Sequence, residues 1–389
     1  MIAPTPYFSD RGCHVRIYEE VRALEARGHT VQVVAYHLGQ TPQGTSVARI
    51  PNIPWYRKLS AGPSWHKPYL DILLLYKALA ESKRFQPDLV HAHLHEGAFL
   101  AALAKRSFGV PVLFDCQGSL TGELLDHSFV RNHGLRYRFF AKLESWINQQ
   151  ADHIVTSSTV MAEKLSRSDS MVASRVTALP DGVDTEVFRP WPKDLALLEE
   201  LGISPDKKLI VYLGAMTEYQ GLDLLLETLG QLADCRNDVH ALLMGYPEAK
   251  YVEKARRKGL MGYITFTGKI NYAEAPRYLG LRDLAIYLKV SETEANGKLL
   301  NYMACGLPCV VFDNPVNREL LGDVGCYAKQ ESVDDVRRVI VALLDQGDVL
   351  AKRAVQIREH AIAAHAWQSR AEMLERIYDS LLSIVRHPE

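Results

Sequence analysis

The residues best suited to chemistry lie late in the chain, where Asn296, Gly297 and Lys298 open a short apolar helical pattern. An apolar run at 284–290 precedes them, and a Gly-Leu-Pro turn then leads to an apolar run at 309–313, so the order predicts strand, helix, strand. A helix N-terminus presents free backbone N–H groups and the positive end of the helix dipole, which suits an anion. Lys298 in the first turn would suit a phosphate. A helix that is merely capped by asparagine and packed by its apolar side chains fits the same pattern, so the pattern leaves both interpretations open.

A second polar group lies near the N-terminus, where Arg11, Gly12, His14 and Arg16 open another helical pattern. Gly12 would let a ligand approach the backbone closely. The three basic side chains could grip a phosphate, or they could be solvent-facing helix charges. The apolar stretch at 1–4 is shorter than the roughly five residues of an ordinary strand, so we expect the natural chain to begin upstream.

Three histidines, His91, His93 and His95, alternate along and just after a predicted strand. Alternate strand residues share a face, which is one requirement for a metal site. No carboxylate or cysteine near them in the sequence completes a ligand set, so we expect no metal, and one imidazole near the end of the strand could instead touch substrate. Six cysteines without a CxxC pair indicate neither a zinc site nor a disulfide framework.

The elements that must position these groups alternate between strand and helix through the whole chain. The predicted strands are 30–35, 88–93, 112–116, 151–158, 176–179, 209–214, 239–244, 264–266, 284–290, 309–313 and 326–328. The predicted helices include 70–84, 98–106, 129–149, 223–232, 249–258, 272–281, 333–344, 349–365 and 368–386. This rhythm predicts an α/β protein with doubly wound parallel sheets. A chain of 389 residues suits two such domains, and Pro and Asp-Gly signals place the linker at 186–196.

Bulk composition narrows the class of protein. The net charge is −1, with 47% apolar and 23% charged residues, so we expect a globular protein without general affinity for nucleic acid. The absence of a signal peptide and of a run of about 18 apolar residues favours a cytoplasmic location. Basic and aromatic residues mix at 53–69 and 129–149. They fit contact with anionic lipids on the inner face of a membrane, but they also fit aromatic packing over the core.

Several motifs in register resemble family 4 of the retaining glycosyltransferases. The family's interdomain PNGVDxxxFxP signature resembles Pro180-Asp181-Gly182-Val183-Asp184 with Phe188 and Pro190, and its E-A-M-A-C-G-x-P segment resembles the stretch from Tyr302 to Pro308. The other matching motifs are Gly28-His29, Val90–His93, Phe266–Gly268 and Trp367. The resemblance implies the GT-B fold, with two Rossmann-like domains facing across a cleft: 1–188 for the acceptor, 189–366 for the nucleotide-sugar, and 367–389 as a helix crossing back.

The chain also departs from this family's pattern. The arginine and lysine that hold the donor diphosphate in the family are missing from the segment between Gly214 and Gln220. A glutamate that binds ribose falls on Asn301, and a histidine of the first domain falls on Gln117. The family's other glutamate corresponds to Glu292 or to Glu294. Neither residue has the usual spacing to residue 301, so the choice stays open. Lys298 would then replace the missing cations.

The resemblance therefore implies a set of site residues. The catalytic residues are Lys298, Glu292 and Gln117, the last touching the sugar from across the cleft. The donor-binding residues are Gly12, Gly214, Gln220, Lys289, Glu294, Asn296, Gly297, Leu299, Leu300 and Asn301. The acceptor-binding residues are Arg11, His14, Arg16 and His95.

The implied activity is transfer of a sugar, with retention and without a metal or other cofactor, from a UDP- or GDP-linked donor. The acceptor would be a lipid-linked or saccharide precursor of the cell envelope. The missing cations also fit two alternatives that keep the fold: a non-catalytic subunit that binds a nucleotide-sugar, and a GT-B epimerase or phosphorylase.

Overall fold

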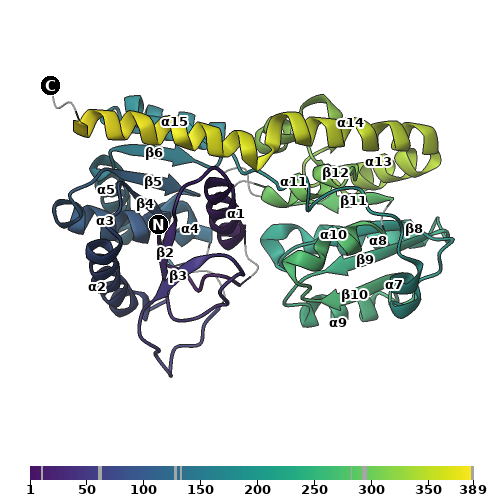
Figure 1. Ribbon diagram of the computed structural model, residues 1–389. Coiled ribbons are helices and arrows are strands. Elements are labelled where there is room, and N and C mark those ends of the chain that lie inside the picture. Colours follow the sequence, from purple (N-terminus) through teal and green to yellow (C-terminus); the bar gives the residue numbers. More distant parts are fainter. Residues whose placement is uncertain are drawn as a thin grey trace. The chain divides into compact units, whose positions relative to one another are not determined.

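A computed structural model describes residues 1–9, 12–59, 64–126, 129–131, 134–281, 283–290 and 296–386. The chain forms two compact units, one made of the described residues up to 181 with the C-terminal segment from Trp367, the other of the described residues between 182 and 366 (Figure 1). Each unit holds one parallel sheet. The predicted α/β class is confirmed.

The first unit is built on a seven-stranded sheet with the order β3-β2-β1-β4-β5-β6-β7. Its strands are β1 (Ile2–Ala3), β2 (Gln32–Ala35), β3 (Ser46–Arg49), β4 (Val90–His93), β5 (Val112–Cys116), β6 (His153–Thr156) and β7 (Val176–Ala178). Its helices are α1 (Gly12–Ala26), α2 (Lys67–Phe85), α3 (Leu94–Phe108), α4 (Leu120–Asp126), α5 (Leu135–Gln150), α6 (Thr159–Ser168) and α15 (Trp367–Arg386). The central strands β4 and β5 are buried along their whole length, as both-face coverage of a parallel sheet requires.

The second unit is built on a six-stranded sheet with the order β10-β9-β8-β11-β12-β13. Its strands are β8 (Lys208–Leu213), β9 (Val239–Met244), β10 (Ile264–Gly268), β11 (Leu284–Tyr287), β12 (Cys309–Phe312) and β13 (Cys326–Ala328). Its helices are α7 (Leu195–Glu200), α8 (Leu222–Ala233), α9 (Ala249–Arg257), α10 (Ala275–Leu279), α11 (Gly297–Ala304), α12 (Pro315–Leu321), α13 (Val333–Asp345) and α14 (Gly347–His365).

The last helix, α15, belongs to the first unit and packs against α1 (Figure 1, yellow and dark purple). Glu375 on this helix pairs with Arg27 at 2.6 Å and with His29 at 2.9 Å. The Tyr378 hydroxyl lies 2.9 Å from Nδ1 of His91. These contacts tie the end of the chain to the first sheet.

Sequence patterns missed or misplaced some elements. The short edge strand β3 and the short helices α4 and α12 were not predicted, because four to seven residues carry too little periodicity. Helix α7 begins inside the predicted linker, where Asp194 caps it by accepting a hydrogen bond from Leu197 N–H. Helix α5 begins at Leu135 rather than at residue 129.

Candidate functional sites

In the second unit, four residues lie together at the carboxyl ends of β8 and β11 and the N-terminus of α11. Gly214, Gln220 and Lys298 were predicted from the sequence, and Tyr287 was not. Lys298 lies so close to Gly214 that a Cβ atom on that glycine would be 3.1 Å from Cε of the lysine. The Lys298 ammonium lies 5.6 Å from the centre of the Tyr287 ring, a distance at which the ring attracts a cation. Tyr287 in turn donates a hydrogen bond of 2.9 Å to Oε1 of Gln220. The carboxyl edge of a parallel sheet is where such folds bind ligands.

Two glycine turns let neighbouring loops pack tightly at this edge. Gly221 has a φ of +75°, and a Cβ atom there would lie 2.0 Å from the Leu288 carbonyl oxygen. A Cβ on Gly245 would lie 1.8 Å from the Gly214 carbonyl oxygen. Larger residues would therefore separate the turns after β8, β9 and β11. The glycines fix where the backbone of the candidate donor site runs.

Three buried tyrosines, Tyr302 on α11, Tyr212 on β8 and Tyr287 on β11, hold the turn after β8 in place. Leu213 N–H at the end of β8 donates to the Tyr302 hydroxyl at 2.7 Å. The Tyr212 hydroxyl donates to the Ala215 carbonyl at 2.7 Å, and its ring stacks with that of Tyr287. Burial raises the pKa of Tyr212 and of Tyr302 well above the ordinary value, so both stay neutral. They orient the turn after β8 rather than take part in proton transfer.

In the first unit, Arg16 makes a buried ion network instead of facing an acceptor. Its guanidinium donates to both oxygens of Asp115, at 2.9 and 3.0 Å, and to Asp181 at 2.6 Å. Glu20, one helical turn further on, lies 3.2 Å from Nε of Arg16. Burial disfavours the charges, but these carboxylates outweigh it and raise the pKa of Arg16 further. Arg16 is buried, so its alternative as a solvent-facing charge is wrong. Its acceptor role stays a prediction, which these contacts within the unit do not favour.

His14 is likewise occupied by the fold. It is fully buried, its Nε2 contacts the Thr5 hydroxyl, and its Nδ1 accepts from Ser9 N–H at 3.0 Å. With both ring nitrogens in use, His14 fastens the segment after β1 and does not fit the predicted acceptor contact.

Family comparisons agree with this architecture. Residues 11–182 match a model described as a glycosyl transferase 4-like domain, and residues 207–346 match glycosyl transferases group 1. The chain belongs to the group 1 glycosyltransferases. It is 25% identical to a phosphatidyl-myo-inositol mannosyltransferase of Mycobacterium leprae, over 98% of this chain and 96% of that protein.

Solved structures of low sequence identity show the same fold as this glycosyltransferase. A sucrose-phosphate synthase from Thermosynechococcus elongatus matches with a TM-score of 0.79 and 15% identity, over 98% of this chain and 96% of that one. HepE of Anabaena in complex with UDP and glucose matches with a TM-score of 0.77 and 16% identity, over 97% and 98%. The two sheets of this glycosyltransferase are thus the Rossmann-like domains of a GT-B fold.

The other predicted donor residues of the glycosyltransferase surround the start of α11. Asn296 is buried and donates from its amide to Asn317 at 2.7 Å, so this side chain anchors the helix start. Lys289, just after β11, is buried. Asn301 is half-buried in the second turn of α11. The last predicted members, Gly297, Leu299 and Leu300, form its first turn, where Leu299 N–H already donates to the Asn296 carbonyl at 2.9 Å. Glu292, Glu294 and Arg11 lie outside the described residues.

Gln117 lies directly after β5 at the carboxyl edge of the first sheet. Its amide nitrogen donates to Oδ2 of Asp115 at 2.8 Å, so the carbonyl oxygen is the end that can accept from a ligand. His95, the second residue of α3, is buried with Nε2 3.5 Å from Glu144. Gly12 begins α1, and a Cβ atom on this glycine would have no atom of the described residues within 4 Å, which leaves room for a ligand.

Sequence reasoning missed the residues that hold these groups in place. Asp115 receives hydrogen bonds from Arg16, Gln117 and Nδ1 of His93. Burial alone would raise the pKa of this carboxyl, but Arg16 and His93 hold it well below the ordinary value. Tyr287 plays the corresponding part in the second unit. Each lies at or past the middle of a predicted strand, and that position was the only available signal.

Proposed function

We propose that this glycosyltransferase transfers a sugar from a UDP- or GDP-linked donor with retention of configuration, and that its second unit binds the donor. The arrangement of Lys298 at the start of α11, against Gly214 and Tyr287, carries the proposal. A diphosphate leaving group gains negative charge as the glycosidic bond breaks. A positioned ammonium group beside a helix N-terminus stabilises that charge without moving.

The proposed mechanism needs no protein base. A glutamine carboxamide such as that of Gln117 cannot take up a proton at neutral pH, although it can hold a sugar hydroxyl. The departing phosphate oxygen is then the group that takes the acceptor's proton, on the face that the leaving group vacates, and this gives retention. Lys298 and the α11 amides supply the positive charge, so the transfer step uses no metal. Asn301 would hydrogen-bond the donor ribose as a neutral partner.

We further propose a lipid-linked acceptor at the cytoplasmic face of a membrane. Four large apolar side chains in the predicted lipid-contact stretches are strongly exposed: Trp55 (72%), Trp65 (83%), Leu135 (84%) and Phe139 (64%). Ring contacts run from Trp65 through Phe129 and Phe140 to Phe139, so the two stretches are continuous on the surface.

Charge favours an anionic bilayer as the occupant of this surface. Arg136, Arg138 and Lys142 are exposed on the same helix as Leu135 and Phe139. Exposed rings and cations together suit the headgroup region of a membrane. The alternative, aromatic cover for the core, applies to Tyr56, which is buried. No helix among the described residues is long and apolar enough to span a bilayer.

Turnover with defined donors tests the reaction. Thermal shifts with UDP- and GDP-sugars identify the donor, and nucleotide release with and without a lipid-linked or saccharide acceptor follows the transfer. We expect release that requires an acceptor, persists in EDTA, and yields a product with the anomeric configuration of the donor by NMR. Binding without turnover would support a non-catalytic subunit, and acceptor-independent nucleotide release would support an epimerase or phosphorylase.

Co-sedimentation with vesicles tests the membrane surface. The chain should bind vesicles containing anionic lipid more than neutral ones, and Phe139→Ser should reduce that binding several-fold. Met261→Ser, at an exposed site in the second unit, is the matched control. Equal binding by both variants would refute this surface, and full activity on a water-soluble saccharide would favour the saccharide acceptor.

A further inference from the structure

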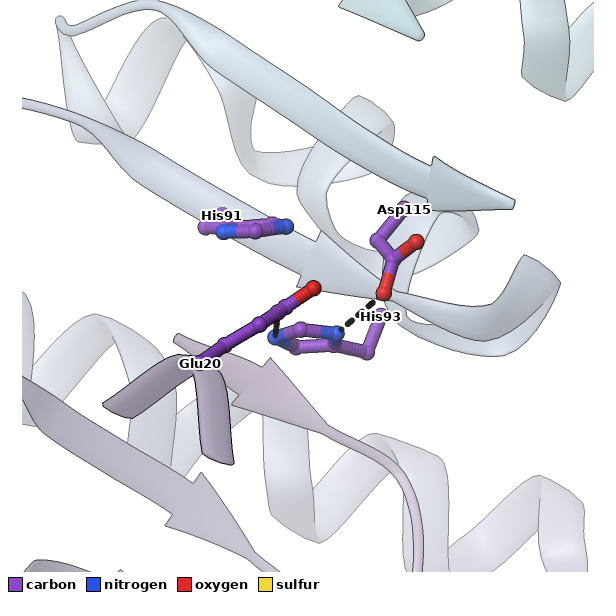
Figure 2. A group of neighbouring side chains, drawn as sticks. All are labelled: Glu20, His91, His93 and Asp115. Carbon is purple, nitrogen blue, oxygen red and sulfur yellow. Dashed lines mark hydrogen bonds and ion pairs between the residues drawn. The ribbon is translucent and has the colours of Figure 1, made fainter. Parts of the chain in front are cut away.

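Four buried side chains converge beneath α1 in the first unit: Glu20 from that helix, His91 and His93 from β4, and Asp115 from β5 (Figure 2). One nitrogen or oxygen from each residue lies within 4.8 Å of those of the others. Glu20, His93 and Asp115 are fully shielded from solvent, and His91 is 2% exposed. The expectation that no carboxylate completes the histidine set is wrong, because the fold brings in Glu20 and Asp115 from distant parts of the sequence.

Several atoms of this cluster have no hydrogen-bond partner among the described residues. They are Nε2 of His91, Nε2 of His93 and both carboxylate oxygens of Glu20. One oxygen of Glu20 lies 3.9 Å from Nε2 of His93, beyond hydrogen-bond distance. Oε1 of Glu20 still lies 3.2 Å from Nε of Arg16, but the other three atoms are buried without a hydrogen-bond partner among the described residues. Buried polar atoms are nearly always paired, so these three call for an explanation.

The opposite nitrogens of the two rings are held in place. Nδ1 of His93 lies 2.9 Å from Oδ2 of Asp115, and because that oxygen is an acceptor, the proton is on Nδ1 and the lone pair is on Nε2. Nδ1 of His91 lies 2.9 Å from the Tyr378 hydroxyl. Metal-bound histidines are held in this way, with the nitrogen that does not bind the metal fixed by a carboxylate or another polar group. The rings lie 4.4 Å apart and nearly parallel, so one ring must turn out of this stack for both Nε2 lone pairs to point at a single ion.

The charges around the cluster are also unbalanced. Arg16 faces three carboxylates, those of Glu20, Asp115 and Asp181. If all three are ionised, two negative charges remain, which is the charge that one divalent cation would neutralise. Without a metal ion, a proton on Glu20 neutralises one of these two charges, because burial raises the pKa of this carboxyl. A metal ion and that proton therefore compete for the same oxygen atoms.

We propose that the first unit binds one divalent transition-metal ion of the zinc type through Nε2 of His91, Nε2 of His93 and the carboxylate of Glu20. Two imidazoles and a carboxylate are a zinc-type set, whereas magnesium and calcium prefer oxygen ligands alone. In a tetrahedral zinc site neighbouring ligand atoms lie about 3.3 Å apart, so Glu20 and His93 approach one another by about half an ångström. The ion joins α1 to β4 and, through Tyr378, to α15. Its role is structural and independent of sugar transfer.

Metal analysis of the full chain, purified without a histidine tag, tests this proposal. We expect about one zinc per chain after dialysis, and tetrahedral visible absorption bands when stoichiometric cobalt(II) is added to metal-free protein. Zinc at a hundredfold excess over its Kd should raise Tm by about 5 °C. Folded chain with no zinc, no cobalt bands and no Tm shift would overturn the proposal and leave the proton on Glu20 as the explanation.

Variants locate the ion. Glu20→Gln and His91→Asn should each lower the metal affinity at least tenfold, whereas His153→Asn, a histidine on β6 bonded to Thr177, should not. Undiminished binding in both cluster variants would place the ion elsewhere and overturn the proposal. If the variants fail to fold, the wild-type cobalt spectrum decides alone, because bands of octahedral oxygen coordination would equally overturn it.

Discussion

Replacing Lys298 by methionine would remove the charge that the proposed reaction needs while keeping most of the side chain's length. The ammonium is positioned before the donor binds, since its stem packs against Gly214 and its charge faces the Tyr287 ring. Loss of one preorganised donor to a developing oxyanion costs about 10²–10³ in turnover, or about 3–4 kcal/mol of transition-state stabilisation. We expect Lys298→Met to lower kcat/KM by that factor, with most of the loss in kcat.

The assay is steady-state nucleotide release with the donor found by thermal shift, with Tm measured in parallel. Lys254→Met, at an exposed lysine that pairs with Asp223 in the same unit, controls for loss of a positive charge. It should leave kcat/KM within about twofold, because exposed ion pairs contribute little. If Lys298→Met turns over as fast as this control at an unchanged Tm, Lys298 has no part in the mechanism.

Three further predictions concern stability. Gly221→Ala should lower the free energy of unfolding by more than about 2 kcal/mol, because φ is positive and the Leu288 carbonyl occupies the methyl position. The control Gly262→Ala has open space around the new methyl group and should not lower it. Equal urea midpoints for the two variants would contradict the prediction. Arg16→Ala should cost about 3–5 kcal/mol in urea unfolding by leaving buried carboxylates unpaired, whereas unchanged stability with a raised acceptor KM would restore its acceptor role. Burial raises the pKa of Asp71 from 3.8 to about 7. The folded state therefore holds this proton more tightly than the unfolded state, and stability falls as pH rises between those values. Asp71→Asn should raise Tm more at pH 8 than at pH 5, and an equal rise at both pH values would show that the pKa shift is absent.

The fold could be predicted from the sequence because its strands are short apolar runs between helical patterns. Strand β5 is buried at every residue and therefore reads as an unbroken run. The candidate donor site was predictable for a similar reason, since the strand, the start of α11 and Lys298 are consecutive in the chain. Local spacing is enough when the elements that form a site are adjacent.

The contacts of the basic residues in the first unit were not predictable, because their partners are distant in sequence. Arg16 pairs with Asp115, 99 residues away, and with Asp181, 165 residues away. A helical pattern shows that residues 16 and 20 share a face, but it does not show that this face covers the ends of β4 and β5. Sequence alone therefore could not separate a buried ion network from a basic ligand site.

The buried ion network at Arg16 changes which chemical groups we expect the first unit to bind. Arg16 and His14 were predicted to grip an acceptor phosphate, yet carboxylates and the Thr5–Ser9 segment already use their donors. What the described edge offers instead is the Gln117 carbonyl oxygen and the start of α1 at Gly12. A carbonyl oxygen only accepts hydrogen bonds, so that of Gln117 suits a hydroxyl group and not a phosphate. We therefore expect the Gln117 carbonyl oxygen to hold a sugar or polyol hydroxyl of the acceptor, and in the proposed mechanism Lys298 supplies the positive charge.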